Sequence, residues 1–358
     1  MMFAALTCLI LLTLGVAEGI PDDACVAMSS EEAASTAGRL LQTRALQASL
    51  EQMELLPFTV PHSLATTNVE PTFWDQNAHC TDGRGYCVEA QPGKPVYFFL
   101  HVAKAAGGSF DFDVLENKRV LPPGSGYFTQ EMCLMDMVHT SGYPGTIVSI
   151  FREPAAQVQS LYYHCSESDD SRRIHTENQQ RPEFATIEAW LAHFAADPNA
   201  DEFGCANPRN FITRLLTCQG THPWFRMFGV NHELYHLAPD DASNLAEAKD
   251  HLEYLTTVGI TDTYQASLCL IISKLGNPLP AGCNCEDPVA WAAFNPPVKE
   301  HGTTVKHGVK DLSQEALSLI AKLTDKDVVL YNIALARFNA DIREAEVLHG
   351  VKILCPKP

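Results

Sequence analysis

A lysine, two glycines and a serine follow an apolar run that begins at Val96. The run Val96 to Leu100 holds five consecutive apolar residues and predicts a fully buried strand. Backbone amides of a glycine-containing turn, with a hydroxyl and an ammonium beside them, are suited to bind a phosphate or sulfate group at the start of a helix. We therefore expect an anion-binding loop directly after this strand. Its residues are Lys104, Ala105, Ala106, Gly107, Gly108 and Ser109.

The order of residues in this loop disfavours an ordinary nucleotide triphosphatase. In the loop of those enzymes the lysine follows the glycines, and a serine or threonine directly after it holds magnesium. Here Lys104 precedes both glycines. A simple glycine-containing turn after a buried strand is an open alternative, so a second motif is needed.

The second motif follows another apolar run, Thr146 to Phe151, which ends at Arg152. Pro154 suits the first turn of a helix, where its missing amide would have no partner. Ser160 follows Arg152 by eight residues, so the two can share one face near the helix start. Because ligands bind at the carboxyl ends of parallel strands, this segment could hold a second phosphate.

These two segments resemble the motifs of the Golgi-type carbohydrate sulfotransferases. The 5′-phosphosulfate loop of that family reads approximately P-K-T-G-G-T-S, and its 3′-phosphate motif reads R-D-P-x-x-R-x-x-S. The resemblance implies a P-loop-like sulfotransferase fold. It also implies transfer of a sulfuryl group from 3′-phosphoadenosine 5′-phosphosulfate (PAPS) to a carbohydrate hydroxyl, with no metal. The matching residues are Lys104, Gly107, Ser109, Arg152, Pro154 and Ser160.

The resemblance assigns roles to the matched residues. Lys104 would stabilise charge on the leaving 5′-phosphate, while the amides and hydroxyl of residues 104–109 hold that phosphate. Arg152 and Ser160 would bind the 3′-phosphate, which distinguishes PAPS from ATP.

A general base should accept the proton of the acceptor hydroxyl, and related enzymes use a glutamate or histidine for it. Glu131 and His139 lie between the two motifs, where this base is often found. An ordinary surface histidine or helix carboxylate is the alternative interpretation of each. His101, beside the strand end, and His164 are further candidates.

Five of the positions at which the chain departs from the family pattern bear on the expected site. Gly108 replaces a threonine and removes one hydroxyl donor to the 5′-phosphate, so we expect weaker binding, in which backbone amides still serve. The other departures are Ala103 for proline, Ala106 for glycine, Glu153 for aspartate and Gln157 for the second arginine.

Further segments extend the resemblance over about Val96 to Phe338, in the order that the family has them. They are Asn210 to Leu216, similar to N-x-x-T-R-x-L; Thr257 to Asp262 followed by Ser267, similar to a late strand and helix; and Leu312 to Ile320 with Asp327 and Leu330 to Asn332, similar to the closing helices.

Buried runs alternate with helical patterns, which predicts a three-layer α/β/α domain with a mainly parallel central sheet. The runs are 96–102, 146–151 and 255–260. Earlier, a helical pattern at 29–53 predicts an N-terminal helical stem, and several prolines then predict a linker. We expect a signal peptide or signal anchor at 1–19, the stem helix and linker at 20–94, and the sulfotransferase domain at 95–358.

Composition restricts the possible partners. With 358 residues and 46% hydrophobic residues the chain can bury a substantial core. The net charge of −18, from 25 Lys and Arg against 43 Asp and Glu, argues against a nucleic-acid partner. We expect a glycan or glycoconjugate acceptor instead. The oligomeric state cannot be read from the sequence.

Two features indicate the secretory pathway, with the Golgi lumen or the extracellular space as destination. Met1 to Ala17 carries no charge, and its apolar centre is shorter than a bilayer span, which favours a signal peptide over a membrane anchor. Twelve cysteines then favour disulfide bonds. Removal of the segment with Cys8 leaves an odd number, so we expect at least one thiol to be free or paired between chains.

Two other functions are open. His232-Glu233-Leu-Tyr-His236 reads H-E-x-x-H, in which two histidines could bind zinc and the glutamate could activate water, as in a secreted metalloprotease. Retention of zinc would identify that function. The altered anion-binding loop also fits a non-catalytic relative that binds PAPS without transfer.

Overall fold

The computed structural model describes residues 86–115, 117, 120–141, 146–167, 182–197, 207–218, 244–294 and 308–355. The chain divides into two compact units, Met1–Glu70 and Pro71–Pro358, and every described residue lies in the second. The expected signal segment and stem helix lie outside the described residues, as do His232, Glu233 and His236.

Five described strands form one sheet in the order β1-β3-β2-β4-β5. β1 pairs antiparallel with β3, and all other pairs are parallel. The expected α/β fold with a mainly parallel sheet is therefore confirmed. β1 precedes residue 95, so the sheet begins within the segment expected to be a linker. The strands are β1 (Tyr86–Val88), β2 (Val96–Leu100), β3 (Gly126–Gln130), β4 (Thr146–Phe151) and β5 (Thr257–Ile260).

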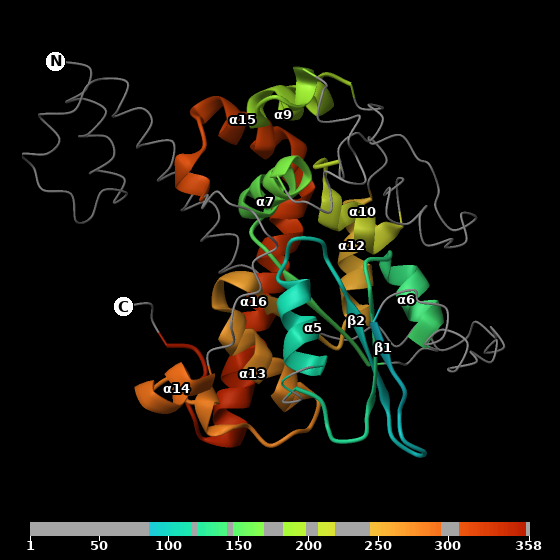
Figure 1. The fold of residues 1–358 in the computed structure, drawn as a ribbon, viewed down its shortest axis with the longest axis vertical. Coiled ribbons are helices and arrows are strands. Elements are labelled where there is room, and N and C mark those ends of the chain that lie inside the picture. The colour runs from blue at the N-terminus through green and yellow to red at the C-terminus, as the bar shows by residue number, and fades with distance from the viewer. Residues whose placement is uncertain are drawn as a thin grey trace, which may run out of the picture. The chain divides into compact units, whose positions relative to one another are not determined.

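The chain adds its next strands on opposite sides of β2. From β2 the chain passes through α5 (Gly107–Leu115) to β3 on one side, and then through α6 (Leu134–Ser141) to β4 on the other side. Because such crossovers are right-handed, the two helices cover opposite faces of the sheet, as Figure 1 shows. The carboxyl ends of β2 and β4 thus form the point where open α/β sheets bind ligands.

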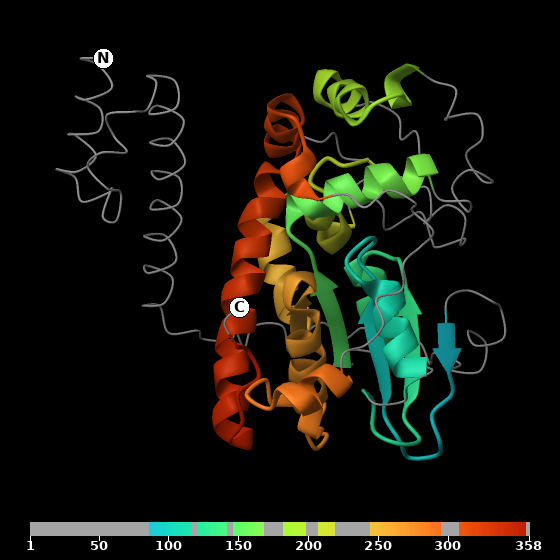
Figure 2. The ribbon, with the colours of Figure 1, turned by 60° about the vertical axis from the view of Figure 1, so that its left-hand side comes forward.

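Helices pack against the sheet through apolar side chains. Phe99 of β2 stacks on Phe110 of α5 with ring centroids 4.3 Å apart, and both rings are fully buried. The long helix α16 packs against β5 and runs beside α13 (Figure 2). The other α-helices of the described residues are α7 (Pro154–Glu167), α9 (Ile187–Ala196), α10 (Phe211–Thr217), α12 (Leu245–His251), α13 (Tyr264–Lys274), α14 (Pro288–Phe294), α15 (Gln314–Leu323) and α16 (Asp325–His349).

The expected disulfide bonds are present, and no described cysteine is free. Cys283 and Cys285 are close in sequence, yet each bonds a different partner. The bonds with both partners described are Cys133–Cys218, Cys269–Cys283 and Cys285–Cys355.

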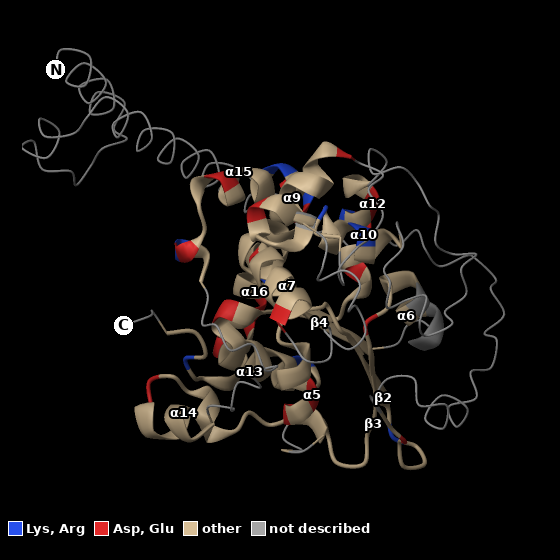
Figure 3. Cartoon of the chain, turned by 45° about the horizontal axis from the view of Figure 1, so that its top comes forward, with Lys and Arg blue, Asp and Glu red and all other residues tan. Residues whose placement is uncertain are grey.

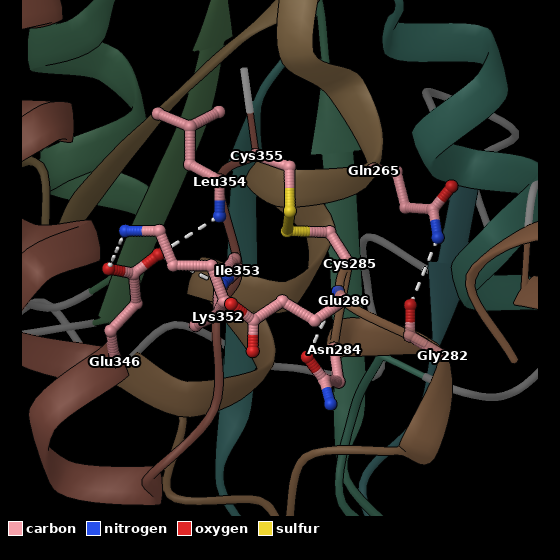
Figure 4. Close-up of a disulfide and its surroundings, with 10 residues drawn as sticks. All are labelled: Gln265, Gly282, Asn284, Cys285, Glu286, Glu346, Lys352, Ile353, Leu354 and Cys355. Carbon is pink, nitrogen blue, oxygen red and sulfur yellow. Dashed lines mark hydrogen bonds and ion pairs between the residues drawn. A yellow bond between two sulfur atoms is a disulfide. The ribbon is translucent and has the colours of Figure 1, made fainter. Parts of the chain in front are cut away.

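The last of these bonds holds the C-terminal segment beside α16 (Figure 4). Glu346 Oε1 accepts hydrogen bonds from the amides of Ile353 and Leu354 at 2.9 and 3.0 Å. Its Oε2 lies 2.7 Å from Lys352 Nζ. One carboxylate therefore closes the turn that follows α16.

Two segments that resemble the family meet as reciprocal helix caps. Asp327 of α16 accepts hydrogen bonds from the amides of Ile212 and Thr213 at the start of α10, at 3.0 and 2.8 Å. Asn210 in turn accepts from the amide of Lys326 at 3.0 Å, at the start of α16. Burial raises the pKa of Asp327 to about 6, although the hydrogen bonds from Thr213 and Ile212 oppose this effect. The N-x-x-T-R-x-L segment is thus part of the framework.

This pairing predicts that Asn210→Ala lowers the free energy of unfolding by about 1–3 kcal/mol. The variant loses the cap of α16 and its bond to Asp325, and it places alanine at a φ of 41°, which asparagine tolerates better. Denaturation with urea, disulfides intact, measures the change. Asn244→Ala, which removes an exposed cap of α12, should cost about 1 kcal/mol or less. An effect of Asn210→Ala no larger than that of the control would contradict the prediction.

Candidate functional site

The two sequence motifs lie side by side at the carboxyl ends of β2 and β4. Arg152 Nη1 donates a hydrogen bond to the carbonyl of Lys104 at 3.1 Å. Gln157 Nε2 donates another to the carbonyl of Ala103 at 2.9 Å. Gln157 replaces the second arginine of the family motif, and here its side chain binds the backbone of the first loop. Both bonds join segments about 50 residues apart in sequence.

The loop after β2 adopts an unusual backbone conformation before α5 begins. Lys104 and Ala106 have φ angles of 61° and 67°, in the left-handed region that favours glycine. The amide of Ala105 closes a turn on the carbonyl of Val102 at 3.1 Å. The first amides of a helix have no carbonyl within that helix, so the loop and the start of α5 form a frame suited to an anion. Residues held this way cluster at functional sites.

Gly107 is required for a reason that the sequence did not reveal. A Cβ atom added at this position would lie 1.9 Å from Nε2 of His101. The start of α5 therefore contacts the imidazole directly. The ring of His101 also lies 5.7 Å from that of Phe99, measured between centroids. His101, a further candidate for the base, therefore packs against both residues.

Two carboxylates face the nitrogens of this imidazole. Nδ1 of His101 lies 3.6 Å from Oδ2 of Asp111 in α5. Nε2 lies 3.6 Å from Oε1 of Glu131, the first residue after β3. On its far side Asp111 accepts a hydrogen bond of 2.6 Å from the hydroxyl of Tyr127. Glu131, one of the two expected bases, thus lies in the candidate site.

Burial in the site favours the uncharged forms of its ionisable groups. Burial lowers the pKa of Lys104 to about 8; the carboxylate of Glu131 opposes this effect and Arg152 adds to it. Burial raises the pKa of Glu131, opposed by His101 and Lys104. Burial also lowers the pKa of His101. Such shifts are typical of sites that move protons or bind charged ligands.

Arg152 lies in a different electrostatic environment. Burial lowers its pKa, while the carboxylates of Asp262 and Glu153 oppose the shift. Glu153 also caps α7, accepting from the amides of Ala155 and Ala156 at 3.1 and 2.7 Å. A glutamate in place of the family's aspartate therefore still caps the helix. Figure 3 marks the Lys and Arg positions of the described residues in blue and the Asp and Glu positions in red. Arg152 is close enough to Lys104 to lower the pKa of that lysine.

The remaining site residues are placed as follows. Gly108 and Ser109 lie in the first turn of α5, and Ser160 is buried on α7. His139 lies on α6, but its side chain is outside the described part of the structure. His164 lies ten residues after Pro154, about 15 Å along α7 from the strand end, which separates it from the other candidates.

Within the described ranges, no group of three or more His, Cys, Asp or Glu is arranged to hold a metal ion. No helix in the same part of the chain is long and apolar enough to span a membrane.

Asp111 and Tyr127 are the members of the site that we did not identify from the sequence. The available signal was two acidic residues among the apolar residues of one helix: Asp111 and Asp113 are both buried on α5. Buried carboxylates are rare unless they are paired, so they mark a polar cluster.

Comparisons with known proteins do not assign this chain to a family: no family model matches it, and no curated protein matches it.

The strained loop predicts that Ala106→Gly raises the free energy of unfolding by about 1 kcal/mol, because glycine tolerates the positive φ. Ala105→Gly, at the adjacent buried position without a positive φ, should instead lower it by about 1 kcal/mol. Urea denaturation measures both values. If the two variants change stability in the same direction, the loop is not strained at Ala106.

Proposed function

We propose that this chain transfers a sulfuryl group from PAPS to a hydroxyl of a carbohydrate acceptor. The observation that carries the proposal is the hydrogen bond from Arg152 to the carbonyl of Lys104. It supports a single ligand with phosphates at both ends, because the two cationic segments are direct neighbours at the topological switch point.

On the donor side, the loop and the start of α5 bind the 5′-phosphosulfate. Lys104 carries the compact positive charge that meets the negative charge developing on the 5′-phosphate as the sulfur–oxygen bond breaks. Its partial burial strengthens that interaction, because little water screens it. Arg152 and Ser160 bind the 3′-phosphate. Arg152 uses one donor on the loop carbonyl and retains others for the ligand.

On the acceptor side, Glu131 is the general base. It follows the strand next to β2 and lies close enough to Lys104 for each to shift the pKa of the other. The acceptor oxygen attacks sulfur, its proton passes to Glu131, and adenosine 3′,5′-bisphosphate leaves. In-line positioning of the two substrates supplies much of the rate, as in phosphoryl transfer.

The disulfide bonds fit an oxidising compartment of the secretory pathway or the extracellular space. We propose the Golgi lumen, where nucleotide donors and glycan acceptors meet.

Labelled sulfate transfer from PAPS to a panel of glycans tests the proposal. We expect transfer by the wild type and a loss of at least about 100-fold in Lys104→Ala, which removes the charge at the leaving phosphate. Lys94→Ala changes an exposed lysine before β2 and should leave the rate unchanged. Equal activity of wild type and Lys104→Ala would overturn the role of Lys104. Binding of PAPS without transfer to any acceptor would identify a non-catalytic relative.

The lowered pKa of Lys104 predicts a decline in activity at mildly alkaline pH. The charged ammonium is the active form, so kcat/KM for PAPS should fall about tenfold per pH unit above pH 8. In Lys104→Arg, whose guanidinium remains charged, the residual activity should persist to higher pH. A wild-type profile that stays level to pH 10 would contradict this assignment.

A further inference from the structure

His101, Asp111 and Tyr127 form a buried polar chain that anion binding does not explain. The chain runs from the hydroxyl of Tyr127 through Asp111 and His101 to Glu131, with separations of 2.6, 3.6 and 3.6 Å. Exposure of the side chains falls inward along it, from 26% for Glu131 to 19% for His101 and 7% for Asp111. Its most exposed member is thus Glu131, at the outer end.

The hydrogen positions along the chain follow from its chemistry. Burial and the adjacent carboxylate raise the pKa of Tyr127 well above its ordinary value, so its hydroxyl keeps its proton and donates to Oδ1 of Asp111. The other oxygen, Oδ2, then faces Nδ1 of His101 as an acceptor. The proton on Nδ1 is therefore directed at Asp111, which leaves Nε2 facing Glu131.

Nε2 of His101 and Oε1 of Glu131 face one another, so a proton between them avoids the repulsion of two lone pairs. Burial lowers the pKa of His101, but the carboxylate of Glu131 opposes this effect, and the cationic imidazole in turn lowers the pKa of Glu131. When the proton is on His101, the imidazolium lies between two carboxylates, and Glu131 is ionised. The second oxygen of Glu131 can then accept a proton from a substrate. The contacts of 3.6 Å are longer than hydrogen bonds, and catalytic hydrogen bonds commonly shorten once substrate binds.

We propose that His101 is a positioning residue for Glu131, which it orients and keeps ionised while Asp111 anchors the imidazole. This inference rests on the proposed sulfuryl transfer. Gly107 has a part in it, because only a residue without a side chain leaves space for the ring. In the transfer step the proton of the acceptor hydroxyl moves to Glu131, and no further reactant is needed.

Rates of sulfate transfer from PAPS, measured against pH on the best acceptor of the glycan panel, test this role. We expect kcat of His101→Gln to fall by about 10- to 100-fold, while the affinity for adenosine 3′,5′-bisphosphate changes less than threefold. The acid limb of the profile should move to higher pH, because the cationic imidazole that lowers the pKa of Glu131 is gone. Lys104 and Asp111, the other charges near Glu131, remain in this variant.

A double-mutant cycle separates positioning from simple structural support. Asp111→Asn should lower kcat in the same way, and the double variant should be no slower than His101→Gln alone, since the two residues act as a unit. Asp113→Asn is the matched control. That carboxylate is equally buried on α5 but bonds Asn117 and Tyr264, so its loss should leave the profile unchanged.

Each outcome decides the inference. If the wild type transfers sulfate and His101→Gln keeps its rate and pH profile, the positioning role is wrong and the proposed function stands. Additive losses in the cycle also overturn it. Should His101→Gln not fold, Asp111→Asn alone with a displaced acid limb supports the role, and an unmoved limb overturns it. Absence of transfer by the wild type overturns both proposals.

Discussion

The candidate site depends on one contact between two strand ends, the hydrogen bond from the Arg152 guanidinium to the carbonyl of Lys104. A partly buried guanidinium needs acceptors, and a loop with two residues in the left-handed region needs support from another segment. The carbonyl of Lys104 supplies an acceptor for the guanidinium, and the guanidinium supports the loop. Gln157 of α7 adds a second such bond to the carbonyl of Ala103, so Arg152 and α7 are held to two consecutive residues after β2.

Much of this arrangement could be predicted because it depends on short stretches of sequence, namely apolar runs and the residues that directly follow them. The apolar runs at 96–100 and 146–151 are β2 and β4, and Arg152 and Glu131 directly follow strands. The rule that ligands bind at carboxyl ends of parallel strands then brings Lys104 and Arg152 together. The antiparallel strand β1 could not be predicted, since its three residues depend on pairing with β3 and not on their own pattern.

Contacts between distant residues were the part that the sequence did not reveal. Asn210 and Asp327 are 117 residues apart, and nothing in either segment says that they cap one another's helices. The partners of Cys283 and Cys285 likewise depend on the tertiary fold, which brings Cys269 to the first and Cys355 to the second. For Gly107, the expected cause was approach of an anion, whereas the closest neighbour of its missing Cβ is His101. The spacing of the motif identified Gly107 as important but did not identify His101 as its neighbour.

Calorimetric titration with adenosine 3′,5′-bisphosphate and with adenosine 5′-phosphate tests the central claim most directly. If one ligand reaches both strand ends, the bisphosphate binds once per chain and at least about tenfold more tightly than the monophosphate. The reason is that hydrogen bonds between the 3′-phosphate and charged groups contribute about 1.5–3 kcal/mol each. The preference disappears in Arg152→Ala. Equal affinity of the wild type for the two nucleotides, or no binding of either, would contradict the account.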